Sequence, residues 1–235
     1  MPIFKKNNRV GFYIHIPKTA GSSVTKLLRN IKCEVALDGG RIEDTKLFDG
    51  ILKNSNLMKC IHNHSPCNPQ HIDKELYRCL VDHSKVDFNF TIVRNPEERI
   101  ISEYFWVKQR YSLSAKYASG ISTYDKTKWV TTANFHEWLI NAKNCYDEDP
   151  YVWDNHFRKQ TDFILSDTKI FRFDQLSKLT NYLNESLETS YEPLSIPHLN
   201  RRRSGSNEIN IGDEDKELIR NWYKDDYELY HSLED

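Results

Sequence analysis

The sequence lacks the cysteine pattern of a disulfide scaffold. Its cysteines number five, an odd count, and no two of them form a CxxC pair. Small extracellular domains that depend on disulfides usually carry an even number of cysteines at regular spacings. The pattern therefore favours free thiols in a reducing compartment. The five are Cys33, Cys60, Cys67, Cys79 and Cys145.

Long apolar runs are also missing from the start of the chain. The first residues, MPIFKKNNRVGFYIHI, begin with basic side chains and continue as a short alternating stretch. This stretch has neither the apolar centre of a signal peptide nor the length of a membrane span. We expect a soluble, cytoplasmic protein with no membrane span, in a cell or a virus-infected cell.

The sequence has no excess of positive charge. The 33 Lys and Arg are balanced by 34 Asp and Glu, which gives a net charge of -1. A non-specific nucleic-acid binder needs a basic surface, so we expect no nucleic-acid partner. An anionic ligand would have to be bound by a local cluster of positive groups.

What the chain does contain suffices for one packed domain over residues 1–235. Its 235 residues are 38% hydrophobic and 12% aromatic, enough for a sizeable core. The mean hydropathy of -0.71 indicates a polar surface.

The first elements predict a nucleotide-binding unit. Val10–Ile16 alternates apolar and other residues, which is typical of a strand. A loop of small residues follows, and then apolar side chains recur at one helical face. Strand, small-residue loop and helix open many α/β nucleotide-binding domains. The face consists of Val24, Leu27, Leu28 and Ile31.

Later patterns extend the same plan. Strands are predicted at Leu57–Ile61, Val86–Val93 and Lys169–Phe173, and helices after Asn95, around residues 135–142 and over 213–233. Asn95 and Pro96 fit an N-cap and a first helical residue. The fold class predicted is α/β, a P-loop-like three-layer fold with a central parallel sheet flanked by helices.

The loop Pro17–Ser23 has the chemistry of a phosphate site. A helix N-terminus directs unpaired amides and a positive dipole at one point, and Lys18, Ser22 and Ser23 add a charge and two hydroxyls. The lysine precedes the loop glycine, Gly21, so this is not a Walker A motif. An ordinary turn with a solvated lysine is the alternative.

A second junction, FTIVRNPEERIISEY, supplies Arg94 where a strand ends and Ser102 in the helix that follows. An arginine fork at the carboxyl end of a strand, with a hydroxyl one to two helical turns later, can clamp one phosphate. Open α/β sheets bind their ligands at that edge.

Together the two junctions resemble those of sulfotransferases that use 3'-phosphoadenosine 5'-phosphosulfate (PAPS). HIPKTAGSS is similar to the 5'-phosphosulfate loop of the carbohydrate branch, which includes the heparan sulfate 2-O- and chondroitin-type enzymes. That branch typically reads IPKTGGTS, so Ala20 and Ser22 depart from it. FTIVRNPEERIISEY resembles the 3'-phosphate motif of the family.

The resemblance implies roles for these residues in a soluble bacterial- or viral-type member. Lys18 would stabilise the leaving phosphate, and PAPS would be bound by the loop and by the second junction. PAP would be the product, with no metal required. The implied donor-binding residues are Lys18, Thr19, Ala20, Gly21, Ser22, Ser23, Arg94 and Ser102.

The segment CIHNHSPC, residues 60–67, offers a candidate base. By the resemblance, His64 would deprotonate a hydroxyl of a carbohydrate or similar acceptor, and His62 would support it. The residue types also allow a zinc site built from Cys60, His62, His64, Cys67 and His71. Structural histidines are the third reading.

Two later segments also resemble the family. DNHFRKQ supplies His156, Arg158 and Gln160 as acceptor-site candidates, although solvated charges at a helix end would look the same. Arg201, Arg202 and Arg203 could bind the nucleotide or an anionic acceptor, or form a solvated basic turn.

The function predicted is sulfonate transfer from PAPS. A non-catalytic PAP-binding module is a second hypothesis. A small-molecule kinase on a related fold is a third, which the missing Walker A motif and the absence of an obvious acidic Mg²⁺ motif disfavour.

Overall fold

The computed structural model describes residues 2–37, 50, 51, 53, 67–112, 132–190, 209 and 211–233. The chain divides into two compact units. Unit 1 comprises Met1–Arg94 and Gln160–Arg201, and unit 2 comprises Asn95–Lys159 and Arg202–Asp235. The expectation of one domain over residues 1–235 stays a prediction.

Unit 1 contains a five-stranded sheet of order β3-β1-β2-β4-β5. β2, β4 and β5 are parallel, whereas β1 pairs antiparallel with both β2 and β3. The predicted α/β fold is confirmed, and the sheet is mixed with a mostly parallel core. The strands are β1 (Ile3–Lys6), β2 (Arg9–Ile14), β3 (Glu34–Ala36), β4 (Phe88–Val93) and β5 (Lys169–Arg172).

The antiparallel strand arises from a tight hairpin. Asn7 and Asn8 join β1 to β2 with φ angles of 49° and 63°. Two consecutive left-handed residues, for which asparagine is well suited, match the twist of a two-residue hairpin turn. The turn sets the register Ile3↔Phe12, so β1 lies antiparallel beside the first predicted strand.

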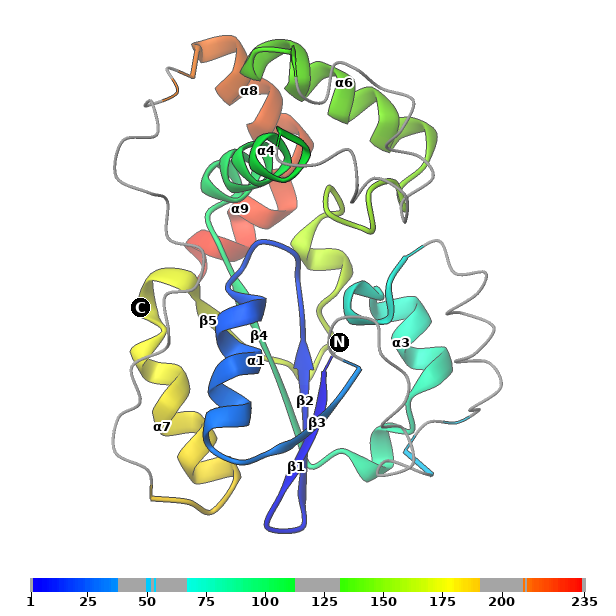
Figure 1. The fold of residues 1–235 in the computed structure, drawn as a ribbon, viewed down its shortest axis with the longest axis vertical. Helices are drawn as coiled ribbons and strands as arrows, with labels where there is room; N and C mark the ends of the chain where they lie inside the picture. The colour runs from blue at the N-terminus through cyan, green and yellow to red at the C-terminus, as the bar shows by residue number, and fades with distance from the viewer. Residues whose placement is uncertain are drawn as a thin grey trace. The chain divides into compact units, whose positions relative to one another are not determined.

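Helices cover both faces of the sheet in unit 1 (Figure 1). On one face, α1 (Gly21–Asn30) and α7 (Ser177–Ser186) pack in a core cluster that includes Tyr13 and Phe90. On the other, α3 (Lys74–Leu80) places Tyr77 4.2 Å, centroid to centroid, from Phe12. Adjacent strand residues point to opposite faces, so unit 1 has the three layers that the sequence predicted.

Unit 2 is helical. Its core cluster joins the predicted face of α6, which includes Phe135 and Trp138, to Ile100, Phe157 and other buried side chains. The predicted N-cap of α4, Asn95, is confirmed, because its Oδ1 accepts from the amides of Glu97 and Glu98 at 3.0 and 3.4 Å. The α-helices described are α4 (Pro96–Ser112), α6 (Phe135–Glu148), α8 (Asp213–Trp222) and α9 (Lys224–His231).

The helix predicted over residues 213–233 is instead two helices that meet at Tyr223. This residue is fully buried, and its hydroxyl donates to the carbonyl of Phe157 at 2.8 Å. Four short 3₁₀ turns complete the described elements: η2 (Pro69–His71), η3 (His83–Lys85), η6 (Gln160–Asp162) and η7 (Phe173–Gln175).

Three sequence expectations bear on these elements. The strand expected at Leu57–Ile61 lies outside the described residues. The four described cysteines, Cys33, Cys67, Cys79 and Cys145, are not joined by disulfides. No helix in the described ranges has both the length and the apolar character needed to cross a bilayer.

Candidate functional site

The loop between β2 and α1 is built from an alternating backbone. Lys18 and Ala20 have φ angles of 68° and 78°, whereas Thr19 between them is not left-handed. Alternation of this kind turns successive amides toward one point and forms an anion-binding concavity. The Thr19 hydroxyl donates to the carbonyl of Ile16 at 2.8 Å within the buried side of the loop. It therefore holds the loop, while Lys18 is half-buried and Ser22 is exposed.

The start of α1 is left without a side-chain cap. Ala20 occupies the N-cap position and makes no capping hydrogen bond from its side chain. Alanine is a poor N-cap, because its side chain offers no oxygen to the amides of the first turn. An anion at this point would meet those amides and the positive end of the helix dipole.

Gly21 is required by its neighbour His15. A Cβ built on Gly21 would lie 1.6 Å from Nε2 of His15. The His15 ring stacks on Tyr13, with centroids 5.5 Å apart, and meets the edge of the buried His71 ring at 4.9 Å. The glycine thus lets an imidazole lie against the first residue of the helix. No role was predicted for His15 from the sequence, although it is the first residue of the HIPKTAGSS segment and lies two residues before the loop.

Arg94 lies at the same edge of the sheet as this loop. β2 and β4 are parallel neighbours with Ile14 opposite Thr91, and the Thr91 hydroxyl donates to the Ile14 carbonyl at 2.8 Å. Because parallel strands end at one edge, the residues after Ile14 and the residues after Val93 emerge side by side. Unit 1 therefore brings together the two strand ends that the sequence predicted as phosphate sites.

Arg94 is contacted by Gln160, the first residue of η6, and by Phe173, which directly follows β5. Its amide donates to Oε1 of Gln160 at 2.9 Å, and its carbonyl accepts from Nε2 of Gln160 at 2.9 Å. Its guanidinium carbon lies 4.4 Å from the centroid of the Phe173 ring, within the range of a cation–π contact. Neither contact with Arg94 is predicted by a pattern in the sequence.

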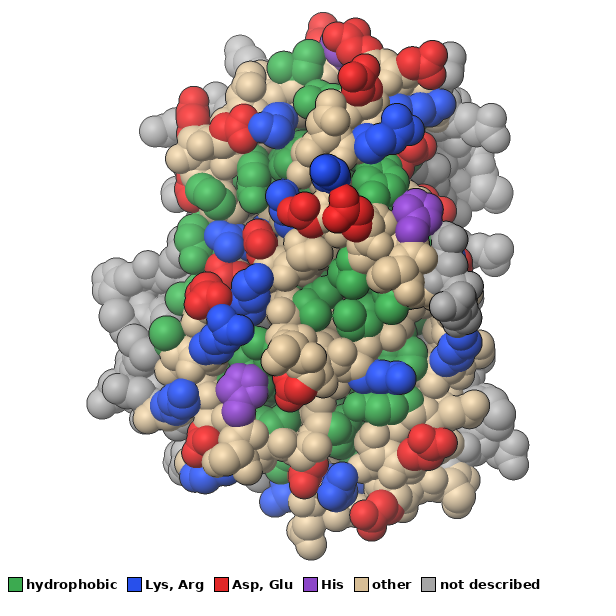
Figure 2. Space-filling view, turned by 180° about the vertical axis from the view of Figure 1, so that it is seen from behind, with side chains coloured by type: hydrophobic (Ala, Val, Ile, Leu, Met, Phe, Trp, Pro, Cys, Tyr) green, Lys and Arg blue, Asp and Glu red, His purple; other side chains and the backbone are tan. Residues whose placement is uncertain are grey.

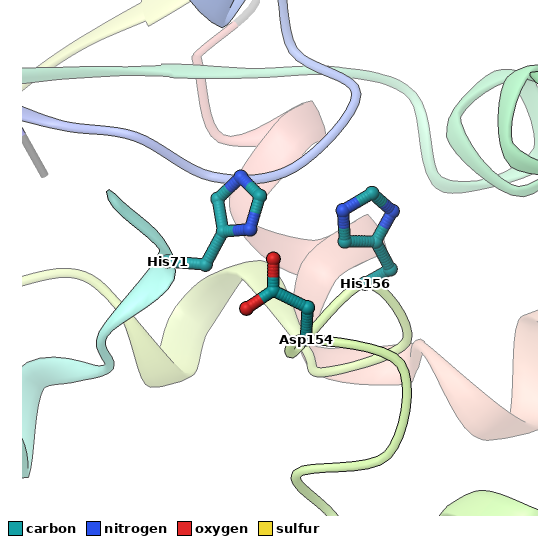
Figure 3. A group of neighbouring side chains, drawn as sticks. All are labelled: His71, Asp154 and His156. Carbon is teal, nitrogen blue, oxygen red and sulfur yellow. The ribbon is translucent and has the colours of Figure 1, made fainter. Parts of the chain in front are cut away.

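His156 belongs to unit 2 and is paired with a buried carboxylate. Its Nδ1 lies 2.8 Å from Oε2 of Glu103, and the two side chains are 11% and 1% exposed. A carboxylate on Nδ1 fixes the orientation of an imidazole. Figure 3 draws His156 with Asp154 on one turn of unit 2, and His71 on η2 of unit 1.

The turn that precedes His156 is left-handed over three residues. Trp153, Asp154 and Asn155 have φ angles of 55°, 59° and 63°. Trp153 and Asn155 are buried, and Nε of Arg158 donates to Oδ1 of Asn155 at 3.1 Å. Nη2 of the buried Arg99 donates to the carbonyl of Arg158 at 2.7 Å. Contacts in the interior of unit 2 thus stabilise the segment that was predicted to border the acceptor.

The remaining predicted residues are placed as follows. Ser102 is half-buried in the second turn of α4, in unit 2. His62, His64 and Arg201–Arg203 lie outside the described residues, as does Cys60 of the zinc alternative. Figure 2 shows basic side chains interspersed with acidic ones on the face it draws, in line with the net charge of -1.

Comparison with known proteins gives one family. The model of the sulfotransferase family matches residues 3–231, which cover both units. No curated protein and no solved structure matches the chain. The match includes the loop after β2 and the strand end at Arg94, where two phosphate sites were predicted. The chain belongs to the sulfotransferase family.

Proposed function

We propose that this sulfotransferase transfers the sulfonate group of PAPS to a hydroxyl of a carbohydrate-like acceptor. The observation that carries the proposal is the neighbouring position of two strand ends in unit 1. The uncapped helix and alternating loop follow β2, and Arg94 follows the adjacent strand β4. Two anion-binding places side by side suit a donor with both a 5'-phosphosulfate and a 3'-phosphate.

In the proposed reaction the acceptor oxygen attacks sulfur in line with the leaving group. The bond between sulfur and the bridging oxygen breaks, and its electron pair stays on the 5'-phosphate, so PAP is formed. Lys18 and the loop amides stabilise this developing negative charge. Positioning and electrostatics would provide most of the acceleration, as in phosphoryl transfer.

The acceptor loses its proton during the attack, and His64 is our proposed base. Donor binding would further use Thr19, Gly21, Ser22, Ser23 and Ser102, and Arg201–Arg203 are candidates for either substrate. His62, His156 and Arg158 are proposed for the acceptor side. The carbohydrate class of the acceptor rests on the resemblance of the CIHNHSPC segment to the 2-O-sulfotransferase branch.

The test is release of PAP from PAPS in the presence of a panel of saccharides, lipids and phenols. The proposal predicts that a saccharide accelerates release and becomes sulfated. Tight PAP binding without transfer to any acceptor would instead support a non-catalytic module. Magnesium-dependent turnover of ATP would support a kinase and contradict the proposal.

A further inference from the structure

We propose that Gln160 is a positioning residue for the arginine that binds the 3'-phosphate. Its side-chain amide fixes the main chain of Arg94 and thereby aims the guanidinium at the donor. The inference rests on the proposed function, in which Arg94 binds the 3'-phosphate of PAPS.

The amide of Gln160 takes the place of a neighbouring strand. The last residue pair of the β4·β5 ladder is Val93↔Arg172, so Arg94 is the first residue beyond the ladder. There, Oε1 accepts from the Arg94 amide and Nε2 donates to the Arg94 carbonyl, both at 2.9 Å. A primary amide carries an acceptor oxygen and a donor nitrogen side by side, so it can accept and donate at the same time in this way. Gln160 thus satisfies both main-chain groups of Arg94.

These two bonds leave Arg94 little backbone freedom. When the N–H and C=O of one residue are both held by one planar group, the direction of its Cα–Cβ bond is held as well. The Phe173 ring, 4.4 Å from the guanidinium carbon, restrains the far end of the side chain. An arginine ordered before the ligand arrives loses less conformational entropy when it binds.

The burial of Gln160 supports this role over contact with an acceptor. The residue is 1% exposed, and both of its polar atoms bond to the Arg94 main chain. It is also where the chain re-enters unit 1, having left that unit after Arg94. The side-chain amide of Gln160 therefore links Arg94, where the chain leaves unit 1, to Gln160, where the chain returns to it.

The experiment compares two probes that differ only in the 3'-phosphate. Binding of PAP and of adenosine 5'-monophosphate (AMP) to the full chain is measured by calorimetry. We expect Gln160→Leu and Gln160→Glu to lower PAP affinity about 10-fold and to leave AMP affinity unchanged. The glutamate carboxylate can still accept from the Arg94 amide but cannot donate to its carbonyl. AMP binding also shows that each variant is folded.

A double-mutant cycle sharpens the test. In an Arg94→Ala background there is no guanidinium to aim, so Gln160→Glu should cause no further loss of PAP affinity. Gln109→Leu, at an exposed position of α4, is the matched control and should change neither affinity.

Each other outcome overturns the inference. Equal losses of PAP and AMP affinity would show that Gln160 has only a general structural role. An unchanged preference for PAP over AMP in both variants would show that Gln160 does not position Arg94. A wild-type chain that binds PAP no better than AMP would overturn the proposed function itself, and the inference with it.

Discussion

The loop at residues 17–23 in unit 1 and the turn at residues 153–155 in unit 2 both place non-glycine residues in the left-handed region, yet their surroundings differ. In the loop, Lys18 and Ala20 are half-buried, and no side chain caps the helix that follows. In the turn, Trp153 and Asn155 are buried among other side chains. A left-handed residue other than glycine, asparagine or aspartate costs about 1–2 kcal/mol, so Lys18 and Ala20 in the loop and Trp153 in the turn are strained.

The two regions differ in what offsets this cost. The turn is stabilised within unit 2, where Trp153 contacts Phe157 and Trp138 with ring centroids 4.5 and 6.2 Å apart. The loop has less burial of this kind, and its conformation orients amides that a ligand can use. We therefore expect truncations in the turn to lower stability, and truncations in the loop to change donor binding and turnover without lowering stability.

The largest stability effect is expected for Trp153→Ala. Truncating a buried tryptophan costs about 3–5 kcal/mol, and alanine at this φ relieves none of the backbone strain. Urea unfolding should show a loss of free energy of unfolding in this range. Ile140→Ala, at an exposed position in α6, is the control and should stay within about 0.5 kcal/mol of wild type. A loss below about 1 kcal/mol for Trp153→Ala would show that burial does not hold the turn.

A smaller effect of opposite sign is expected for Ala20→Gly. Glycine removes the left-handed penalty at Ala20, and the added entropy of the unfolded chain offsets part of the gain. The free energy of unfolding should rise by about 0.5–1 kcal/mol in the same assay. Ala142→Gly, in the buried interior of α6, should lower it by about 1 kcal/mol or more. If both substitutions destabilise equally, Ala20 is not strained.

The smallest expected effect is a change in the pH dependence of stability at His136, near the start of α6. This position lies in unit 2 but outside the turn at residues 153–155. A 2.6 Å contact between its Nδ1 and Oδ1 of Asp215 raises the pKa of His136 above the usual 6.5. The stabilisation is fully present below pH 6.5 and is lost as pH rises through the raised pKa. Unfolding measured across this range should lose that pH dependence in His136→Gln and in Asp215→Asn. If both variants keep the wild-type profile, the pair does not contribute.

Sequence patterns predicted the elements that are determined by residues close together in the sequence. The alternation of Val10–Ile16, the helical face that begins at Val24 and the Asn95 cap are each specified within about one or two turns of chain, and all three are confirmed. Of the candidate site, the sequence placed the loop and Arg94 each at the end of a strand, and the structure shows that these two strands, β2 and β4, are neighbours. The roles of both in binding stay predictions.

The rest depends on partners distant in the sequence. β1 and β3 are only four and three residues long, and such short strands are defined by the strand they pair with. The bonds between Gln160 and Arg94 span 66 residues. Tryptophan disfavours the left-handed conformation, so no local pattern predicts it at Trp153. The packing of the Trp153 ring in unit 2 stabilises this conformation.

We expect the loop after β2 to act on the sulfonate donor, and substitution of Lys18 tests this role. Sulfonate transfer at saturating PAPS should fall about 10²–10³-fold in kcat for Lys18→Ala, as for loss of one group that stabilises a leaving-group charge. Lys26→Ala, an exposed lysine of the same helix, should retain the wild-type rate. A Lys18→Ala chain that transfers sulfonate as fast as Lys26→Ala would show that the loop does not act on the donor in this way.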